Sequence, residues 1–410
     1  MASSTEHPFV SGNNAPVHDE TTIKHLVVSG TLPATLSGHY LRIGSNPIPG
    51  APLPNGWTAG EGMVHAIALS AGRAVSYRNR WIRTDAASRK LGLEPVPGLK
   101  ATLHDSSATN LITYAGTILS LGDCALAYHL TRDLETVRRV DLAGGGRAIG
   151  AYPKTDPATG ELHLLSSPGE TSCAYHVISA GGLTRRSRAI PSASLPIRDL
   201  AITRDRLILV SDGLVGVTHR HVDDRITWLP AATTATDHVV SAYDDGDAVV
   251  VHVVGQTLRR LTLRVSAQHV ACKTLDPVPQ RFGRINERLA LSCHRFLYTV
   301  PADPGTSIDR HDLVAGTRES HDFGPGRHPG EFLFVEDPDR TATEDGGWLL
   351  GLVHDLAADL TSFVVLDAAR VTGPAVATVM IPRRVPFGLH GLWVPMGHSS
   401  PLTSTTKEQQ

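Results

Sequence analysis

"MVHAIALSAGRAVSYRNRW", residues 63–81, shows the pattern that determines the predicted fold. A short, largely apolar run, 63–69, and a run of alternating character, 74–81, flank the polar turn "SAGR". Such a pair around a glycine-containing turn is typical of a β-hairpin. We therefore predict two antiparallel strands in this stretch.

Similar pairs recur along the whole chain. They are "ELHLLS" with "CAYHVIS" (161–179), "RLILV" with "LVGVTH" (206–219), "AVVVHVV" with "LRRLTLRV" (248–265) and "WLLGLVHD" with "SFVVLDA" (348–368). Repeated meanders favour an all-β, seven-bladed β-propeller, in which about seven blades of roughly 50 residues each account for the length. Two packed β-sandwich domains are the alternative, although no linker-like change in composition separates two halves.

The predicted domain organisation is a single propeller between two loose ends. The propeller domain covers residues 21–397. Residues 1–20 and 398–410 are polar and poor in apolar residues, so we predict flexible N-terminal and C-terminal tails there.

Composition and charge exclude several classes of partner. The 38 basic and 40 acidic residues give a net charge of -2, which predicts no nucleic-acid partner. A small apolar organic substrate is the better expectation.

The N-terminus has no basic and apolar leader pattern, and no apolar run approaches the length of a membrane span. A cytoplasmic protein is therefore predicted, and peripheral contact with membrane lipid is left open. The oligomeric state also stays open. The cysteines have no ligand-like spacing: Cys124, Cys173, Cys272 and Cys293.

Several stretches together resemble the carotenoid cleavage oxygenase family. Their order and approximate spacing match over nearly the whole chain: "GTLPATLSGHYLRIGSNP" (30–47), "GEGMVHAIAL" (60–69), "GRAVSYRNRWIRT" (72–84), "YPKTDPATGELHLL" (152–165), "RDLAITRDRLIL" (198–209), "HVVSAYDD" (238–245), "GEFLFVED" (330–337), "DGGWLLGLVHD" (345–355) and "PFGLHGLW" (386–393). The resemblance implies a seven-bladed propeller with a dome of loops over an axial site. It also implies one Fe(II) held by four histidines, with glutamates behind three of them, that cleaves an alkene with O2; one animal branch instead isomerises a retinyl ester.

This sequence departs from that pattern at half of the implied iron ligands. His238 and His390 stand at two of the four histidine positions, whereas Tyr152 and Arg198 stand at the other two. Glu331 stands at one glutamate position. The remaining two glutamate positions are aligned with Asp123 and Arg281.

The departures argue against the implied iron site. A guanidinium offers only donors, and Arg198 at about 5 Å from a dication would repel it by roughly 6 to 7 kcal/mol at an effective dielectric near 20. A Tyr152 phenolate would favour ferric over ferrous iron. The sequence therefore favours no metal cofactor. If Fe(II) is retained, His238 and His390 are the expected ligands, with Glu331 completing a triad of two histidines and one carboxylate.

Three functions from different classes follow. The favoured one is a metal-independent isomerase, cyclase or lyase of secondary metabolism acting on a polyene, terpenoid or polyketide-like substrate, with Tyr152, Arg198, His238, His390 and Glu331 as catalytic residues. The alternatives are a non-heme Fe(II) dioxygenase that cleaves a carotenoid, stilbene or similar alkene, and a non-catalytic propeller that binds an apolar ligand. Neither GxSxG nor HExxH is present, so the sequence does not support a serine hydrolase or a zinc protease of the simplest kind.

Other interpretations of single residues are structural. Tyr152 could fill the volume of a missing imidazole, and Arg198 with Asp199 could form a surface ion pair. Four other histidines lie on ordinary strand patterns and are expected to be packed or exposed: His65, His176, His252 and His354.

Overall fold

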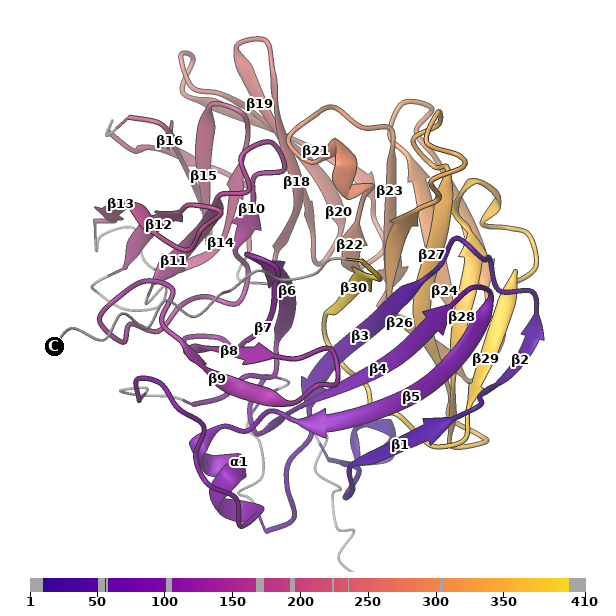
Figure 1. Cartoon of the computed structure of the whole chain (residues 1–410). Coiled ribbons are helices and arrows are strands. Elements are labelled where there is room, and N and C mark those ends of the chain that lie inside the picture. Colours follow the sequence, from indigo (N-terminus) through magenta and orange to yellow (C-terminus); the bar gives the residue numbers. More distant parts are fainter. Residues whose placement is uncertain are drawn as a thin grey trace, which may run out of the picture.

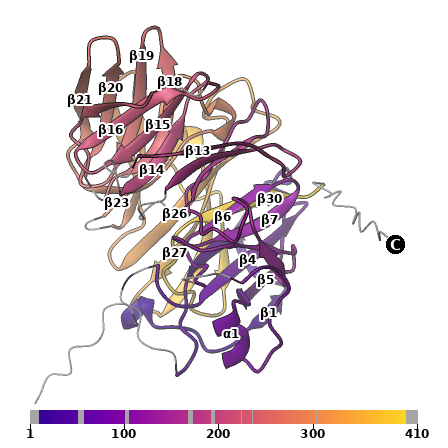
Figure 2. The ribbon, with the colours of Figure 1, turned by 90° about the vertical axis from the view of Figure 1, so that its left-hand side faces the viewer.

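The structure is a computed structural model that describes residues 10–397 except 51–55, 57, 101–104, 167–172, 192–195, 223–224, 235 and 303–304. The residues described form seven antiparallel sheets arranged as the blades of a propeller (Figure 1). In a view turned by 90°, β14–β16 and β18–β21 lie at the opposite end of the molecule from β1, β4, β5 and α1 (Figure 2). The predicted seven-bladed all-β fold is confirmed. The predicted C-terminal tail lies outside the described residues.

Five blades consist of four strands that are consecutive in the chain. Their bounds are β6 Asn110–Tyr114, β7 Thr117–Leu121, β8 Ala127–Leu130 and β9 Thr136–Val140; β10 Lys154–Thr155, β11 Leu162–Ser166, β12 Ala174–Ile178 and β13 Thr184–Ala189; β14 Ile197–Ile202, β15 Arg206–Ser211, β16 Leu214–His219 and β17 Thr227–Pro230; β18 His238–Asp245, β19 Ala248–Val254, β20 Leu258–Arg264 and β21 His269–Asp276; and β22 Gln280–Arg284, β23 Phe296–Pro301, β24 Ser307–Asp312 and β25 Thr317–Asp322.

The other two blades combine both ends of the chain and so close the ring. One has the order β1 (Thr21–Lys24), β5 (Arg73–Trp81), β4 (Gly62–Ser70), β3 (Gly38–Ser45) and β30 (Gly391–Pro395). The other has the order β2 (Val27–Gly30), β29 (Ala377–Ile381), β28 (Leu360–Asp367), β27 (Gly347–Asp355) and β26 (Arg327–Glu336). Helices are few: α1 (Asp85–Lys90) and the 3-10 turns η1 (Gly12–Asn14), η3 (Glu287–Leu289) and η4 (Ala368–Arg370).

The hairpins predicted from alternation are confirmed. Strands β4 and β5 pair around the turn at residues 70–73, and the other four predicted pairs are β11 with β12, β15 with β16, β19 with β20 and β27 with β28. Strand β19 is buried on both faces because it lies between neighbouring sheets, which explains why five of its seven residues are valines. His65, His176, His252 and His354 are all buried on strands, as expected.

Four innermost strands lose regular register near the axis. The shifts lie between Ile197 and Asp199 in β14, Val239 and Ser241 in β18, Arg281 and Arg284 in β22, and Pro329 and Phe332 in β26. A bulge redirects side chains and ends regular pairing. The same kind of irregularity therefore recurs in four of the seven blades, those that begin with β14, β18, β22 and β26.

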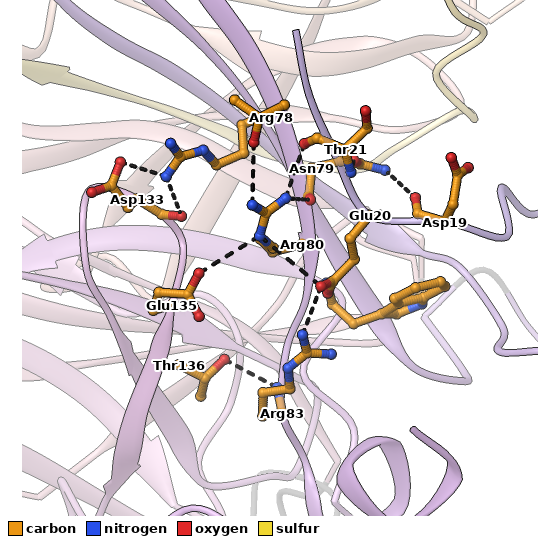
Figure 3. Close-up of polar contacts among 12 residues, drawn as sticks. Asp19, Glu20, Thr21, Arg78, Asn79, Arg80, Arg83, Asp133, Glu135 and Thr136 are labelled. Carbon is orange, nitrogen blue, oxygen red and sulfur yellow. Dashed lines mark hydrogen bonds and ion pairs between the residues drawn. The ribbon is translucent and has the colours of Figure 1, made fainter. Parts of the chain in front are cut away.

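The described part of the N-terminal segment, residues 10–20, packs on the propeller, although its composition predicts a tail. The backbone of Asn13 accepts from Phe387 N at 3.0 Å, and the amide of Asn46 exchanges two hydrogen bonds of 2.8 Å with the backbone of Val17. Glu20 accepts from Trp81 N at 2.8 Å and pairs with Arg83 at 2.7 Å (Figure 3). These polar residues bond to the protein rather than to water. No helix among the described residues has both the length and the apolar character needed to cross a membrane.

The Glu20 contacts predict a measurable contribution to stability. Glu20→Ala should lower the free energy of unfolding by about 1–3 kcal/mol, because it leaves the Trp81 N–H and the half-buried Arg83 without their acceptor. The matched control is Glu135→Ala, which removes only an ion pair of 3.6 Å with Arg80 at an exposed position and should cost about 0–1 kcal/mol. Urea unfolding of both variants checks this. Equal losses would contradict a structural role for residues 10–20.

Candidate functional site

A cavity of about 990 Å³ lies on the propeller axis. Four of the predicted site residues line it, namely Tyr152, His238, Glu331 and His390, whereas Arg198 does not. Loop residues also border it, from the connection between β3 and β4 and from the segment before β30. A cavity of this volume is large enough for an extended organic molecule.

Glu331 is the most strongly bonded group of the site. The bulge in β26 places its carboxylate, which is 1% exposed, between three neighbouring elements. Oε1 accepts from His390 Nδ1 at 3.0 Å and from Arg284 Nε at 2.9 Å, and Oε2 accepts from Gly391 N at 2.6 Å. Burial alone would raise the pKa of Glu331, but Arg284, His390 and Arg42 outweigh it and hold the pKa far below its usual range. Glu331 is therefore a carboxylate that orients His390.

The bond to Glu331 also fixes which nitrogen of His390 carries the proton. The Nδ1 nitrogen donates to the carboxylate, so in the neutral ring the lone pair is on Nε2. His390 packs edge-on against two aromatic rings, Tyr152 at 5.5 Å and Phe282 at 5.9 Å between centroids. The ring is thus held in one orientation at the cavity wall.

Tyr152 brings the two histidines into one cluster. Its ring lies 4.9 Å from that of His238 and 5.5 Å from that of His390. Burial is the main reason that the pKa of Tyr152 is raised, and the carboxylates of Asp123, Asp199 and Glu331 add to it. This shift favours the protonated phenol, which can donate a proton or a hydrogen bond.

His238 is the first residue of β18 and faces the cavity. Enclosure by the protein lowers its pKa, although the nearby Asp199 partly opposes this shift. The imidazole of His238 is therefore neutral at neutral pH and offers a proton acceptor. Tyr152, His238 and His390 together form an acid and base cluster.

Arg198 lies outside the axial cavity, contrary to the inward position considered from the sequence. The bulge between Ile197 and Asp199 leaves Arg198 exposed beside a small recess that it shares with Asp123 and Tyr152. Its neighbour Asp199 is buried and lines the cavity instead. The position that sequence reasoning assigned to a cation thus holds a carboxylate.

Asp199 is already fully engaged. It accepts from Leu200 N at 2.7 Å and from Val239 N at 2.9 Å, and Lys154 Nζ lies 3.4 Å from it. Asp123, aligned with an implied glutamate, sits in the recess, where enclosure by the protein raises its pKa and the charge of His390 partly offsets this. The carboxylates of Asp123 and Asp199 both contribute to the electrostatic field of the site. In the described structure, neither carboxylate forms a hydrogen bond with His238 or His390.

Other site residues were not singled out from the sequence. Arg42 of β3, Phe282 and Arg284 line the cavity, and Arg42 and Arg284 surround Glu331 with Arg42 Nη1 at 4.0 Å. Arg42 lies within the stretch "YLRIGSNP" and Arg284 within "RFGRIN". The apolar residues around Arg42 and Arg284 predict strands. They give no indication that these two cations, which lie on different blades, come together in the structure.

The described residues do not fit a four-histidine iron site. Of the four implied histidine positions only two hold an imidazole, His238 and His390; His328 also lines the cavity but stands at none of these positions. Burial raises the pKa of Tyr152, and both oxygens of Glu331 accept from N–H donors. In the part of the chain that the structure describes, the single cluster of three close metal-binding side chains is Asp276, Asp309 and His311, none of which lines the cavity. Glu331 stands behind His390 and cannot serve both that ring and a metal without rearrangement.

Comparison with known proteins identifies the relatives of this chain. The family model described as "Retinal pigment epithelial membrane protein" matches residues 14–234 and 212–395. A "Carotenoid cleavage oxygenase" of Mycobacterium tuberculosis is 30% identical, over 96% of this chain and 99% of the relative. A "Carotenoid 9,10(9',10')-cleavage dioxygenase 1" of Pisum sativum is 25% identical, over 96% and 91%.

Two solved structures share the fold. The Trp149Ala mutant of the Synechocystis apocarotenoid oxygenase is 21% identical, with a TM-score of 0.83 over 93% of this chain and 97% of that one. The lignostilbene dioxygenase of Pseudomonas brassicacearum is also 21% identical, with a TM-score of 0.83 over 96% and 100%. From its matched family model and its full-length relatives, the chain belongs to the carotenoid cleavage oxygenase family.

Proposed function

We propose that this chain is an enzyme that binds an elongated apolar organic molecule in the axial cavity and transforms it by acid and base chemistry without a bound metal. The substrate class is a polyene, terpenoid, stilbene-like or polyketide-like compound. The names of the relatives, which refer to carotenoids and to lignostilbene, support an extended unsaturated substrate.

The observation that carries the proposal is the cluster of Tyr152 with His238 and His390. A phenol that keeps its proton stands between two imidazoles, one neutral because of enclosure and one oriented by Glu331. Such groups are suited to donate a proton to one carbon or oxygen of a bound substrate and to accept a proton elsewhere. Isomerisation, cyclisation or lyase chemistry fits this set.

Each residue has a distinct role in this mechanism. Tyr152 donates its phenolic proton as the substrate gains negative charge, and His390 Nε2 accepts a proton from the substrate. Glu331 stabilises the imidazolium that forms, because its carboxylate already accepts from Nδ1. His238, whose ring lies 4.9 Å from that of Tyr152, is the second acceptor.

A second candidate function is cleavage of an alkene by a non-heme Fe(II) dioxygenase, and the relatives favour it. Relatives and structural neighbours are named oxygenases or dioxygenases. One neighbour is a cobalt-substituted apocarotenoid oxygenase, which supports a resident metal in that protein. For this chain the candidate requires iron binding by His238 and His390 with help from a third group.

Substitution of Tyr152 tests its role as a proton donor. Tyr152→Phe keeps the ring contacts with both histidines and removes only the hydroxyl, so we expect kcat to fall by roughly 10²- to 10⁴-fold. Substrate binding should change little. Turnover of polyene, stilbene and polyketide candidates is followed by liquid chromatography and mass spectrometry, and ligand binding by calorimetry.

The matched control is Tyr114→Phe, because the Tyr114 hydroxyl bonds to the backbone of Ser179 and neither residue lines the cavity. It should leave kcat unchanged. An unchanged kcat in Tyr152→Phe would mean that the ring only fills space. Ligand binding without any product in the wild type would instead favour a non-catalytic binding protein.

Oxygen dependence separates the two candidate reactions. Acid and base chemistry consumes no O2, so the wild type should turn over equally fast in air and under argon, and a product formed under ¹⁸O2 should carry no label. Alkene cleavage by a dioxygenase would stop under argon and give labelled carbonyl products. Treatment with a ferrous chelator provides the matched control and should leave turnover unchanged. Loss of turnover under argon would contradict the proposal.

A further inference from the structure

Strand β22 places several consecutive residues in the axial cavity. Arg281, Phe282, Gly283 and Arg284 all line it, although neighbouring residues of a regular strand face opposite sides. The register shift between Arg281 and Arg284 and the positive φ of Phe282, 57°, make this arrangement possible. A left-handed conformation is unusual for a bulky residue. The local backbone thus presents Arg281 and Phe282 together to the cavity.

Arg281 differs from the other cations of the cavity in lacking a carboxylate. Arg284 pairs with Glu331 at 2.9 Å, and Lys154 lies 3.4 Å from Asp199. Arg42 lies 4.0 Å from Glu331 and donates to the backbone of Gly388. Among the described residues no acidic side chain pairs with Arg281, whose guanidinium lies 5.4 Å from the centroid of the Phe282 ring and is exposed.

Arg42 adds to the positive field beside Phe282, although Glu331, which also pairs with Arg284, lies 4.0 Å from it. The Arg42 guanidinium lies 5.1 Å from the centroid of the same Phe282 ring, and its buried Nη1 atom has no hydrogen-bond partner in the described structure. The cavity wall at β22 therefore carries positive charge that a bound anion would neutralise. The guanidinium groups of Arg42 and Arg281 lie near the same aromatic ring and repel each other. A bound anion would offset this repulsion.

We propose that Arg281 binds a carboxylate at one end of the elongated substrate, so that the chain acts on an acidic member of its substrate class. A planar guanidinium binds a carboxylate through two parallel N–H donors. Phe282 supports the guanidinium face, and the same Phe282 contacts His390, which links the anchor to the acid and base cluster. This inference rests on the proposed function and names its substrate more narrowly.

Paired acids and esters of the same carbon skeleton test the proposal. The probes are retinoic acid with methyl retinoate, and trans-4-stilbenecarboxylic acid with its methyl ester. Calorimetry on the full chain should show that at least one acid binds on the order of ten- to a hundredfold more tightly than its ester, because a charge-assisted hydrogen bond forms only with the acid. Arg281→Gln should abolish this preference and leave the affinity for the ester unchanged.

Two further variants control the test. Arg281→Lys retains the charge without the fork and should keep part of the preference. Arg370→Gln removes a cation whose side chain is 83% exposed in η4, outside the cavity, and should keep all of it. The unfolding midpoint of Arg281→Gln should equal that of the wild type, since among the described residues the Arg281 side chain has no hydrogen bond or ion pair to lose.

The outcomes distinguish this inference from the proposed function. If acids and esters bind equally well to the wild type, or if Arg281→Gln keeps the preference for acids, the inference about Arg281 is wrong while binding of an apolar ligand stands. If neither acids nor esters bind, both the proposed function and the inference are overturned.

Discussion

The buried carboxylate of Glu331 is the interaction on which the centre of this propeller depends. It joins β26 to β22 through Arg284, to β30 through Gly391 N, and to His390, which immediately precedes β30. Strand β30 in turn pairs with β3, so the carboxylate lies where the ring is closed. Removing one partner of a buried ion pair typically costs about 3–5 kcal/mol, because the remaining charge is left without a counterion. Closure of the ring and orientation of His390 thus rely on the same side chain.

This network defines the electrostatic character of the cavity. Because Glu331 is ionised and bonded to N–H donors, it supports an imidazole but has no oxygen free of a donor. Because Tyr152 retains its proton, the third member of the cluster is a donor. A set with one phenol and two imidazoles suits proton transfer better than it suits a ferrous ion, for which neutral nitrogen and ionised oxygen ligands are preferred. The relatives that share this fold are named as an oxygenase and a dioxygenase.

Much of the fold could be predicted from the sequence because strands have a simple period. Alternation and turn residues revealed five hairpins, and the motif order led to the family. Four of the residues proposed from the motifs line the axial cavity, and their catalytic roles stay predictions. The position of Arg198 could not be read in this way. One extra residue at the bulge in β14 reverses which of Arg198 and Asp199 faces the cavity. No local sequence pattern predicts this bulge.

Interactions between segments that are distant in the chain could not be predicted from the sequence either. Arg42 and Glu331 meet across the ring closure, and the sequence contains no signal that pairs them. Residues 10–20 have the composition of a tail, yet their polar groups bond to Asn46, Trp81 and Arg83. Polar composition predicts contact with polar groups but does not say whether those groups belong to water or to the protein.

The most direct measurement of the central claim is the iron content of the axial site. The chain is produced with Fe(II) supplied in excess, purified without chelator and analysed by plasma mass spectrometry beside His238→Ala and His390→Ala. The account predicts iron well below one atom per chain in the wild type, with no further loss in either variant. Stoichiometric iron in the wild type that both substitutions remove would contradict it.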